Sequence, residues 1–187
     1  MAAPTLGDQL AMASLRDGEV MIGPVLPEDL GALFVWINDA GAAALDLPYR
    51  PTDCIAYKDW LDKVSKDSSQ ILFAIRRIDA PHCIGFLLFK NFHSVHRTAE
   101  LGVRIGVEAD RGKHCGMAAL RLAMRYAWDT LNLHRISLSA LAANARAIAC
   151  YRGAGFHEEG LLRHGAFVAG QWQDVVLMAA LNPHQLG

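Results

Sequence analysis

Hydrophobic and polar residues follow two different periods along this chain, which predict a mixture of strands and helices. In the segment 99–107, Leu101, Val103 and Ile105 occupy one side and mostly polar residues occupy the other. A period of two is typical of a half-buried strand. Comparable apolar runs predict further strands over residues 20–25, 71–76, 83–89 and 135–141.

Apolar residues spaced three and four positions apart predict helices between those strands. The clearest apolar stripe runs through residues 117–131. Pro27 is followed by two acidic residues, which favours the start of an earlier helix, and another helix is expected after Thr52. Asn144 is a good N-cap, and Gly155 a good C-terminal stop, for a shorter helix.

The final segment, residues 156–181, predicts two strands joined by a turn near Ala169 and Gly170. Turn signals elsewhere are spaced as in alternating strands and helices, and no repeat or low-complexity linker interrupts them. The pattern as a whole therefore predicts one continuous domain of mixed α/β type.

The composition supports a single domain and argues against binding to nucleic acid, to a membrane or to a metal ion. With 187 residues, 52% of them hydrophobic, the chain can build one core without disulfides or metal. Basic and acidic residues nearly balance, so no basic field is available to hold nucleic acid. No apolar run is long enough for a membrane span. The four cysteines form no C-x-x-C pair and no signal peptide is evident, so we expect a cytoplasmic protein without a metal site.

The loop from Asp110 to Gly116 has the features of an anion site. Gly112 and Gly116 allow a ligand to approach the backbone, and the loop leads into a helix whose first N–H groups have no internal partner. Arg111 and Lys113 add positive charge. The loop lacks the Gly-Lys-Ser/Thr triplet of a nucleotide-hydrolysing P-loop. Taken alone, it fits an ordinary strand-to-helix turn with solvated cations about equally well.

Two motifs in register connect this loop to a known family. The first is Arg111-Gly112-Lys113-x-x-Gly116, and the second is Asn144-x-x-Ala147-Ile148-x-x-Tyr151. Together they resemble the GCN5-related N-acetyltransferase (GNAT) family. Residues 100–102, 131–135 and 159–163 resemble its branch of ribosomal-protein N-terminal acetyltransferases, which also contains amino-sugar, polyamine and antibiotic acetyltransferases.

This resemblance implies a GNAT-like domain over about residues 15–182, with a mixed, mostly antiparallel central sheet and about four flanking helices. Residues 1–14 would be a mobile leader and residues 183–187 a C-terminal tail. The family binds acetyl-coenzyme A as co-substrate between two splayed strands, here the strand ending near Val107 and the strand starting at Arg135.

The resemblance also implies roles for individual residues. Pantetheine would pair with the backbone of Ile105, Gly106 and Val107, and N–H groups near Val107 would polarise the thioester carbonyl. Asn144 would hold the pantetheine arm. Tyr151 would give a proton to the departing thiolate, since a phenol is mostly protonated at neutral pH. The pyrophosphate would lie on backbone N–H groups of Arg111, Gly112, Lys113, His114, Cys115, Gly116 and Met117.

Three positions depart from the family pattern or lack an assigned role. The family usually has glycine where this chain has His114, so the loop keeps its shape without glycine or the imidazole contacts the cofactor. Ser139 stands where some members carry a glutamate base. Glu100 is the nearest acidic substitute, acting through water, and the alternative is a rim carboxylate paired with Arg104 or Arg97.

We therefore expect an enzyme that moves an acetyl group from acetyl-coenzyme A to a primary amine by direct attack. A site without a strong base suits a protein N-terminal α-amine or an amino sugar of low pKa. Freeing an α-amine at pH 7 costs about 1.4 kcal/mol, against about 4.6 kcal/mol for a lysine amine. The alternatives are a small amine, such as an amino sugar, polyamine or aminoglycoside, and a non-catalytic acyl-coenzyme A-binding regulatory module. The sequence does not fix the oligomeric state, for which a homodimer is the ordinary prior.

Overall fold

The computed structural model describes residues 14–43, 50–67, 69–79 and 82–185. The expected leader therefore lies outside the described residues apart from Ser14, as do the last two residues of the expected tail. The described part of that tail forms a 3-10 turn, η3 (Pro183–Gln185). Within the described residues, no helix is long and apolar enough to cross a membrane.

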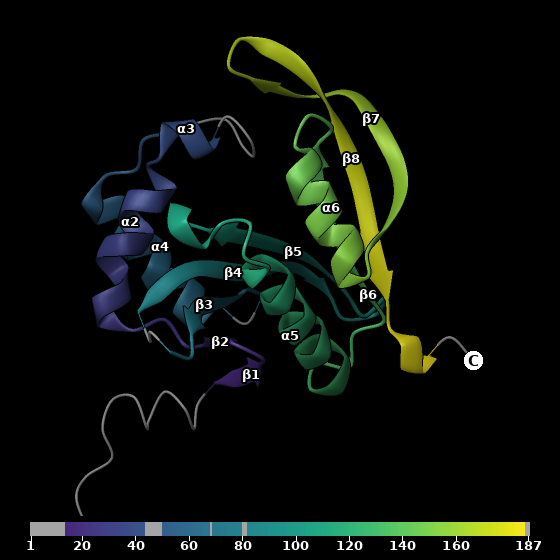
Figure 1. The fold of residues 1–187 in the computed structure, drawn as a ribbon, viewed down its shortest axis with the longest axis horizontal. Coiled ribbons are helices and arrows are strands. Elements are labelled where there is room, and N and C mark those ends of the chain that lie inside the picture. The colour runs from purple at the N-terminus through teal and green to yellow at the C-terminus, as the bar shows by residue number, and fades with distance from the viewer. Residues whose placement is uncertain (1–13, 44–49, 68, 80–81, 186–187) are drawn as a thin grey trace, which may run out of the picture.

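One mixed sheet of eight strands organises the fold (Figure 1). All neighbouring strands are antiparallel except β5 and β6, which confirms the expected mostly antiparallel sheet. In spatial order, the strands are β1 (Leu15–Asp17), β2 (Val20–Gly23), β3 (Ile71–Arg77), β4 (Cys83–His93), β5 (Thr98–Ile105), β6 (Arg135–Leu141), β8 (Gln171–Leu181) and β7 (His157–Val168).

The helices cover both faces of this sheet. Side chains alternate between the faces of a strand, and β5 shows which helices lie where. Leu101 is 3% exposed and belongs to the core cluster that includes the buried residues of α5, whereas Arg104 donates a hydrogen bond to the end of α2. The helices are α2 (Leu30–Ile37), α3 (Ala40–Ala43), α4 (Cys54–Lys66), α5 (Cys115–Asp129) and α6 (Ala145–Ala154), with 3-10 turns η1 (Pro27–Asp29) and η2 (Glu108–Asp110).

The elements expected from the hydrophobic pattern are present, with differences at their ends. Strand β6 has the expected bounds, and the Ala169–Gly170 turn joins β7 to β8 with positive φ angles at both residues. Strand β4 extends four residues past the expected end at Phe89, because its pairing with β5 continues to His93. The four-residue helix α3 was not anticipated, since its small residues carry no apolar period.

The sheet divides where β5 and β6 meet. Their parallel pairing covers only three positions, ending at Glu100 opposite Ser137, although β5 continues to Ile105 and β6 to Leu141. Beyond these pairs the two strands separate. In Figure 1, β7, β8 and α6 stand on the right, and β1–β3 with α2 and α4 stand on the left. The expected splay of these two strands is therefore confirmed.

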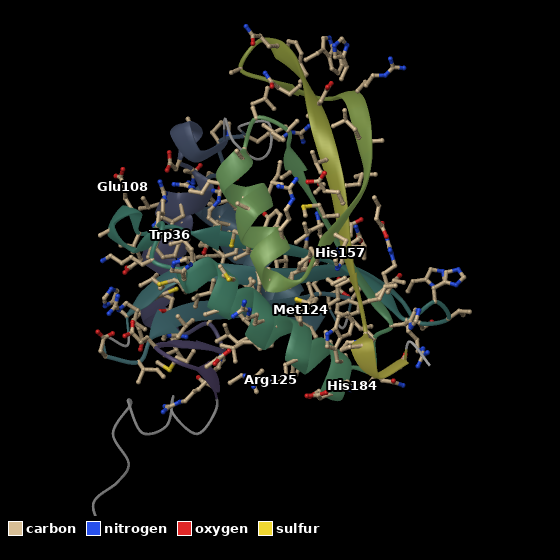
Figure 2. The ribbon with its side chains drawn as sticks, turned by 45° about the vertical axis from the view of Figure 1, so that its right-hand side comes forward. Trp36, Glu108, Met124, Arg125, His157 and His184 are labelled. Carbon is tan, nitrogen blue, oxygen red and sulfur yellow. The ribbon has the colours of Figure 1, made fainter. Side chains whose placement is uncertain are left out.

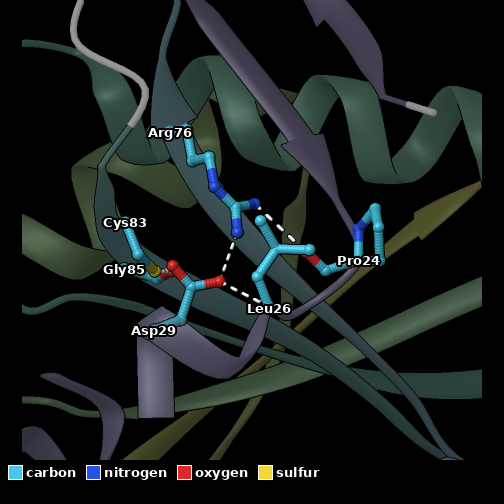
Figure 3. A network of polar contacts seen from close by, with 6 residues as sticks. All are labelled: Pro24, Leu26, Asp29, Arg76, Cys83 and Gly85. Carbon is cyan, nitrogen blue, oxygen red and sulfur yellow. Dashed lines mark hydrogen bonds and ion pairs between the residues drawn. The ribbon is translucent and has the colours of Figure 1, made fainter. Parts of the chain in front are cut away.

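A buried ion pair fixes the start of α2 to β3 (Figure 3). Arg76 and Asp29 bond to each other with side chains only 1% and 4% exposed. Asp29 Oδ2 also accepts the Leu26 N–H at 2.8 Å, and Arg76 Nη1 donates to the Pro24 carbonyl at 3.1 Å. Burial raises the pKa of the Asp29 carboxyl, while the Leu26 N–H and the Arg76 charge oppose that shift. The chain between β2 and α2 is thereby tied to the sheet.

We predict that Asp29→Ala will destabilise the protein by about 3–5 kcal/mol, because it leaves the Arg76 charge buried without a partner. Chemical denaturation monitored by circular dichroism measures this free energy of unfolding. Lys66→Ala removes an exposed i,i+4 pair with Asp62 and serves as the control, with little expected change. Equal effects of the two substitutions would contradict the assignment.

Candidate active site

The separation of β5 and β6 opens a cavity of about 720 Å³. Its walls come from the second half of β5, the loop and first turn of α5, the middle of β6 and one side of α6. Two residues after α2 complete it. Among the described residues, the cavity is lined by Asp39, Gly41, Leu101, Gly102, Val103, Arg104, Ile105, Asp110, Arg111, Gly112, His114, Cys115, Gly116, Met117, Ser139, Ala140, Asn144, Arg146, Ala147, Ala149, Cys150 and Tyr151.

The loop before α5 has the shape of an anion cradle. His114 is the N-cap of α5 and has φ +59°, while Gly112 has φ +80°. The first N–H groups of the helix, at Cys115, Gly116 and Met117, have no partner within the helix, and the Ala118 N–H is the first to bond back, to the His114 carbonyl. Glycine adopts a left-handed backbone without strain, and the loop has this conformation with histidine at position 114.

Two residues of α6 face the same cavity. The Asn144 Oδ1 accepts the Ala147 N–H at 3.1 Å, which confirms Asn144 as the N-cap. Tyr151 lies two turns further along, is partly buried, and has its ring centre 6.3 Å from that of Phe156. Both side chains line the cavity opposite β5. The spacing that identified them in the sequence therefore brings them to one wall.

Hydrogen bonds to β4 and to Arg111 fix the end of β5, and the local sequence does not predict them. The N–H groups of Gly106 and Val107 both donate to the Ile84 carbonyl, at 2.9 and 3.2 Å. Arg111 Nε and Nη2 donate to the carbonyls of Ile105 and Gly106, both at 3.0 Å. The Val107 N–H, expected to polarise the thioester, is thus already engaged with β4.

Backbone groups that face the cavity come instead from odd positions of β5. Successive residues of a strand point their N–H and C=O groups to opposite edges. Because the Gly106 N–H is directed at β4, the backbone groups of Val103 and Ile105 are directed toward β6. Pairing with β6 has ended before these residues. Of the expected cofactor residues, Gly106, Val107 and Lys113 are not among the described cavity-lining residues, whereas the others are.

Glu100 does not line this cavity. Its carboxylate lies 3.6 Å from the Lys90 ammonium on β4, and the two side chains are 47% and 45% exposed. The expected partners Arg104 and Arg97 were therefore wrong, because Lys90 is its direct cross-strand neighbour in the β4–β5 pairing. Ser139 does line the cavity.

Two thiols in the cavity wall are poorly suited to act as nucleophiles. Burial raises the pKa of Cys150, and burial with the nearby Asp110 carboxylate raises the pKa of Cys115. Both are then held in the neutral form, which is the less reactive form of the side chain. This agrees with a reaction by direct attack and without a covalent enzyme intermediate.

These features define a class of protein. Residues 19–157 match the acetyltransferase (GNAT) domain, which is well over half of the chain, and the chain therefore belongs to the GNAT family. It is an N-acetyltransferase that uses acetyl-coenzyme A, as expected from the two motifs in register.

The chain is similar along much of its length to individual acetyltransferases. Spermidine N(1)-acetyltransferase of Escherichia coli K12 is 31% identical over 168 residues, 89% of this chain and 87% of that protein. The [ribosomal protein uS5]-alanine N-acetyltransferase of the same organism is 30% identical over 128 residues, 66% and 63% of the two chains. The crystal structure of Vibrio cholerae spermidine N-acetyltransferase in complex with CoA and spermine has a TM-score of 0.83 at 24% identity, covering 91% of this chain and 100% of that chain.

Sequence reasoning missed several residues of the cavity wall. Asp39 and Gly41 follow α2, far in sequence from the two motifs, and no local signal connects them to the site. Arg146 lies inside the second motif, two residues after Asn144, and its basic side chain was a visible signal.

We predict that the His114→Gly variant will be more stable than the His114→Ala variant by about 1 kcal/mol and will unfold at a higher temperature. The reason is that alanine keeps a Cβ in the left-handed backbone, whereas glycine does not. Differential scanning calorimetry of the two variants measures this. Equal stabilities would show that the loop relaxes out of the left-handed conformation when the imidazole is removed.

Proposed function

We propose that this enzyme transfers the acetyl group of acetyl-coenzyme A to a primary amine that carries a single positive charge, with a protein N-terminal α-amine as the first candidate. The observation that carries the proposal is the cavity between β5 and β6, which joins an anion cradle at one end to Tyr151. The family match supports the reaction, and the charges of the cavity wall support the choice of amine.

The anion cradle would hold the diphosphate of the co-substrate. Three N–H groups at the first turn of α5 and the positive end of the helix dipole favour a phosphate there. Arg111 and Arg146 add positive charge among the lining residues. Asn144 would contact the pantetheine arm from α6, and the thioester would approach the edge of β5.

The chain would assist the reaction at both ends of the breaking bond. The N–H groups of Val103 and Ile105, on the edge of β5 away from β4, would polarise the thioester carbonyl. The amine nitrogen forms the new C–N bond as the C–S bond breaks. Tyr151 would give its phenolic proton to the departing sulfur, and the amine would lose its extra proton to water, since Glu100 lies outside the cavity.

The charges of the cavity-lining residues support an acceptor amine with one positive charge. The described lining residues include three arginines, whereas their acidic side chains are those of Asp39 and Asp110. Asp110 is buried and lies 3.6 Å from Arg77, which offsets its charge. A polycation would bind most tightly where several unpaired carboxylates line the site. The two acidic residues among the described lining residues therefore favour an acceptor with fewer positive charges. An α-amine is also easier to deprotonate at pH 7 than an alkyl amine such as that of lysine.

A second candidate acceptor is a polyamine. The observation that favours it is the 31% identity with spermidine N(1)-acetyltransferase of Escherichia coli over most of both chains. In that case Asp39 would be the described carboxylate placed to contact the amine.

We predict that Tyr151→Phe will lower kcat by about 10²-fold or more, because a positioned general acid contributes about that factor. The dissociation constant for acetyl-coenzyme A should stay within about twofold, since the phosphate contacts lie on α5. Release of free thiol measures turnover and calorimetry measures binding. Tyr126→Phe removes a hydroxyl from a ring packed on Phe73 and is the matched control. Unchanged turnover of Tyr151→Phe would exclude the proton-donor role.

The acceptor is decided by a competition assay that offers peptides with free N-termini, spermidine and an aminoglycoside at equal concentration. We expect kcat/KM for the preferred peptide to exceed that for spermidine by about tenfold or more, which corresponds to about 1.4 kcal/mol. Mass spectrometry of the products measures the ratio. A preference for spermidine of similar size would replace the first candidate with the second.

A further inference from the structure

The indole of Trp36, in the last turn of α2, lies directly against the backbone of Gly106, just beyond the end of β5. A Cβ at position 106 would come within 2.0 Å of the indole carbons Cδ2 and Cε2. Gly106 is not among the described residues with positive φ, so its backbone conformation does not require glycine. Glycine is needed there because the ring approaches so closely. Figure 2 shows Trp36 on the same side of the molecule as Glu108, which begins η2.

A hydrogen bond joins the same two elements. Arg104 Nη1 on β5 donates to the Trp36 carbonyl at 2.6 Å, and this bond is partly buried. Arg104 also lines the cavity. The C-terminal end of α2 is therefore attached to β5 by a ring contact at Gly106 and by a polar contact at Arg104.

These contacts act on a stretch of strand that the sheet supports from one side only. After Glu100, β5 has no pairing with β6. Its end is held by the Ile84 carbonyl on β4, by Arg111 and by Trp36. The pairing with β4 continues to Ile105 opposite Gly85. The orientation of the cavity-facing N–H groups of Val103 and Ile105 therefore depends on this pairing and on the attachments at the end of the strand.

We propose that Trp36 and Arg104 are positioning residues that hold the end of β5 in the geometry required for acetyl transfer. The inference rests on the proposed function, because it assumes that the thioester lies along this edge of β5. Asp39, two residues after α2, lines the cavity. The end of α2 therefore joins a part of the cavity wall to the strand that would face the thioester.

A positioning role predicts an effect on turnover more than on binding of the co-substrate. Preorganised N–H donors must match the position where charge develops on the carbonyl oxygen. A misplacement of about 1 Å can cost on the order of 10²-fold in rate. The N–H groups proposed to hold the diphosphate lie on α5, and the loop before it is joined to the end of β5 by Arg111. We therefore expect a smaller effect on affinity for acetyl-coenzyme A than on turnover.

The test is a double-mutant cycle between Gly106→Ala and Trp36→Ala. Gly106→Ala drives a methyl group into the indole, and we expect kcat to fall by on the order of 10²-fold, with the dissociation constant for acetyl-coenzyme A within about threefold. Trp36→Ala makes room for that methyl group. The double variant should therefore recover at least about tenfold in kcat over Gly106→Ala alone. Gly31→Ala, on the same helix with open space around its added methyl, is the matched control and should retain parental kcat.

A second pair of variants makes a milder change at the same junction. Arg104→Met removes the donor to the Trp36 carbonyl, whereas Arg104→Lys keeps one. We expect kcat to fall by about tenfold in the methionine variant and to recover at least partly in the lysine variant. This pair gives a result even where Gly106→Ala does not fold.

The outcomes separate this inference from the proposed function. If the double variant shows no recovery of kcat over Gly106→Ala alone, the two substitutions act independently and the positioning role is overturned. Turnover by the parent enzyme would still uphold the proposed function. Equal losses in the two Arg104 variants would also count against it. A parent enzyme without acetyl transfer to any amine would overturn both proposals.

Discussion

The fold depends on a parallel pairing that stops after three positions. The strands β5 and β6 remain in one sheet near Glu100 and Ser137, and then separate while both continue. An unpaired strand edge inside a protein is costly unless its backbone groups find other partners. Here the separation exposes the edge of β5 to a cavity, and a ligand with an extended, amide-bearing arm is a suitable partner for it. The candidate active site follows from this interruption of the sheet.

The two ends of the cavity are built by different physical means. At the end proposed to hold the phosphate, the left-handed backbone of His114 turns the chain into α5, whose first residues line the cavity. At the end proposed for the reaction, Tyr151 comes from α6, a helix that begins at the Asn144 cap. Local backbone geometry shapes the proposed anion site, whereas the packing of α6 beside the gap places the proposed acid.

Helix α2 connects the core to the cavity. Its start is fixed by the buried Arg76–Asp29 pair, and its end by the contact of Trp36 with Gly106 and by the bond from Arg104. Desolvation of both charges offsets much of the attraction in a buried ion pair, but the loss of one partner leaves a buried charge uncompensated. The helix is therefore located at both ends by contacts to the sheet, and the residues that follow it enter the cavity wall at Asp39.

The sequence by itself determined the longer helices and strands, the family and the residues of both motifs, but not the short elements β1 and α3. Helix caps such as Asn144, turns such as Ala169–Gly170 and the two hydrophobic periods depend on neighbours within a few positions, so they can be recognised in one chain. Only the tertiary structure decided that Lys90 pairs with Glu100, that Arg111 binds carbonyls of β5, and that Trp36 covers Gly106. These contacts join residues whose proximity depends on strand register and helix packing, which local sequence patterns do not specify.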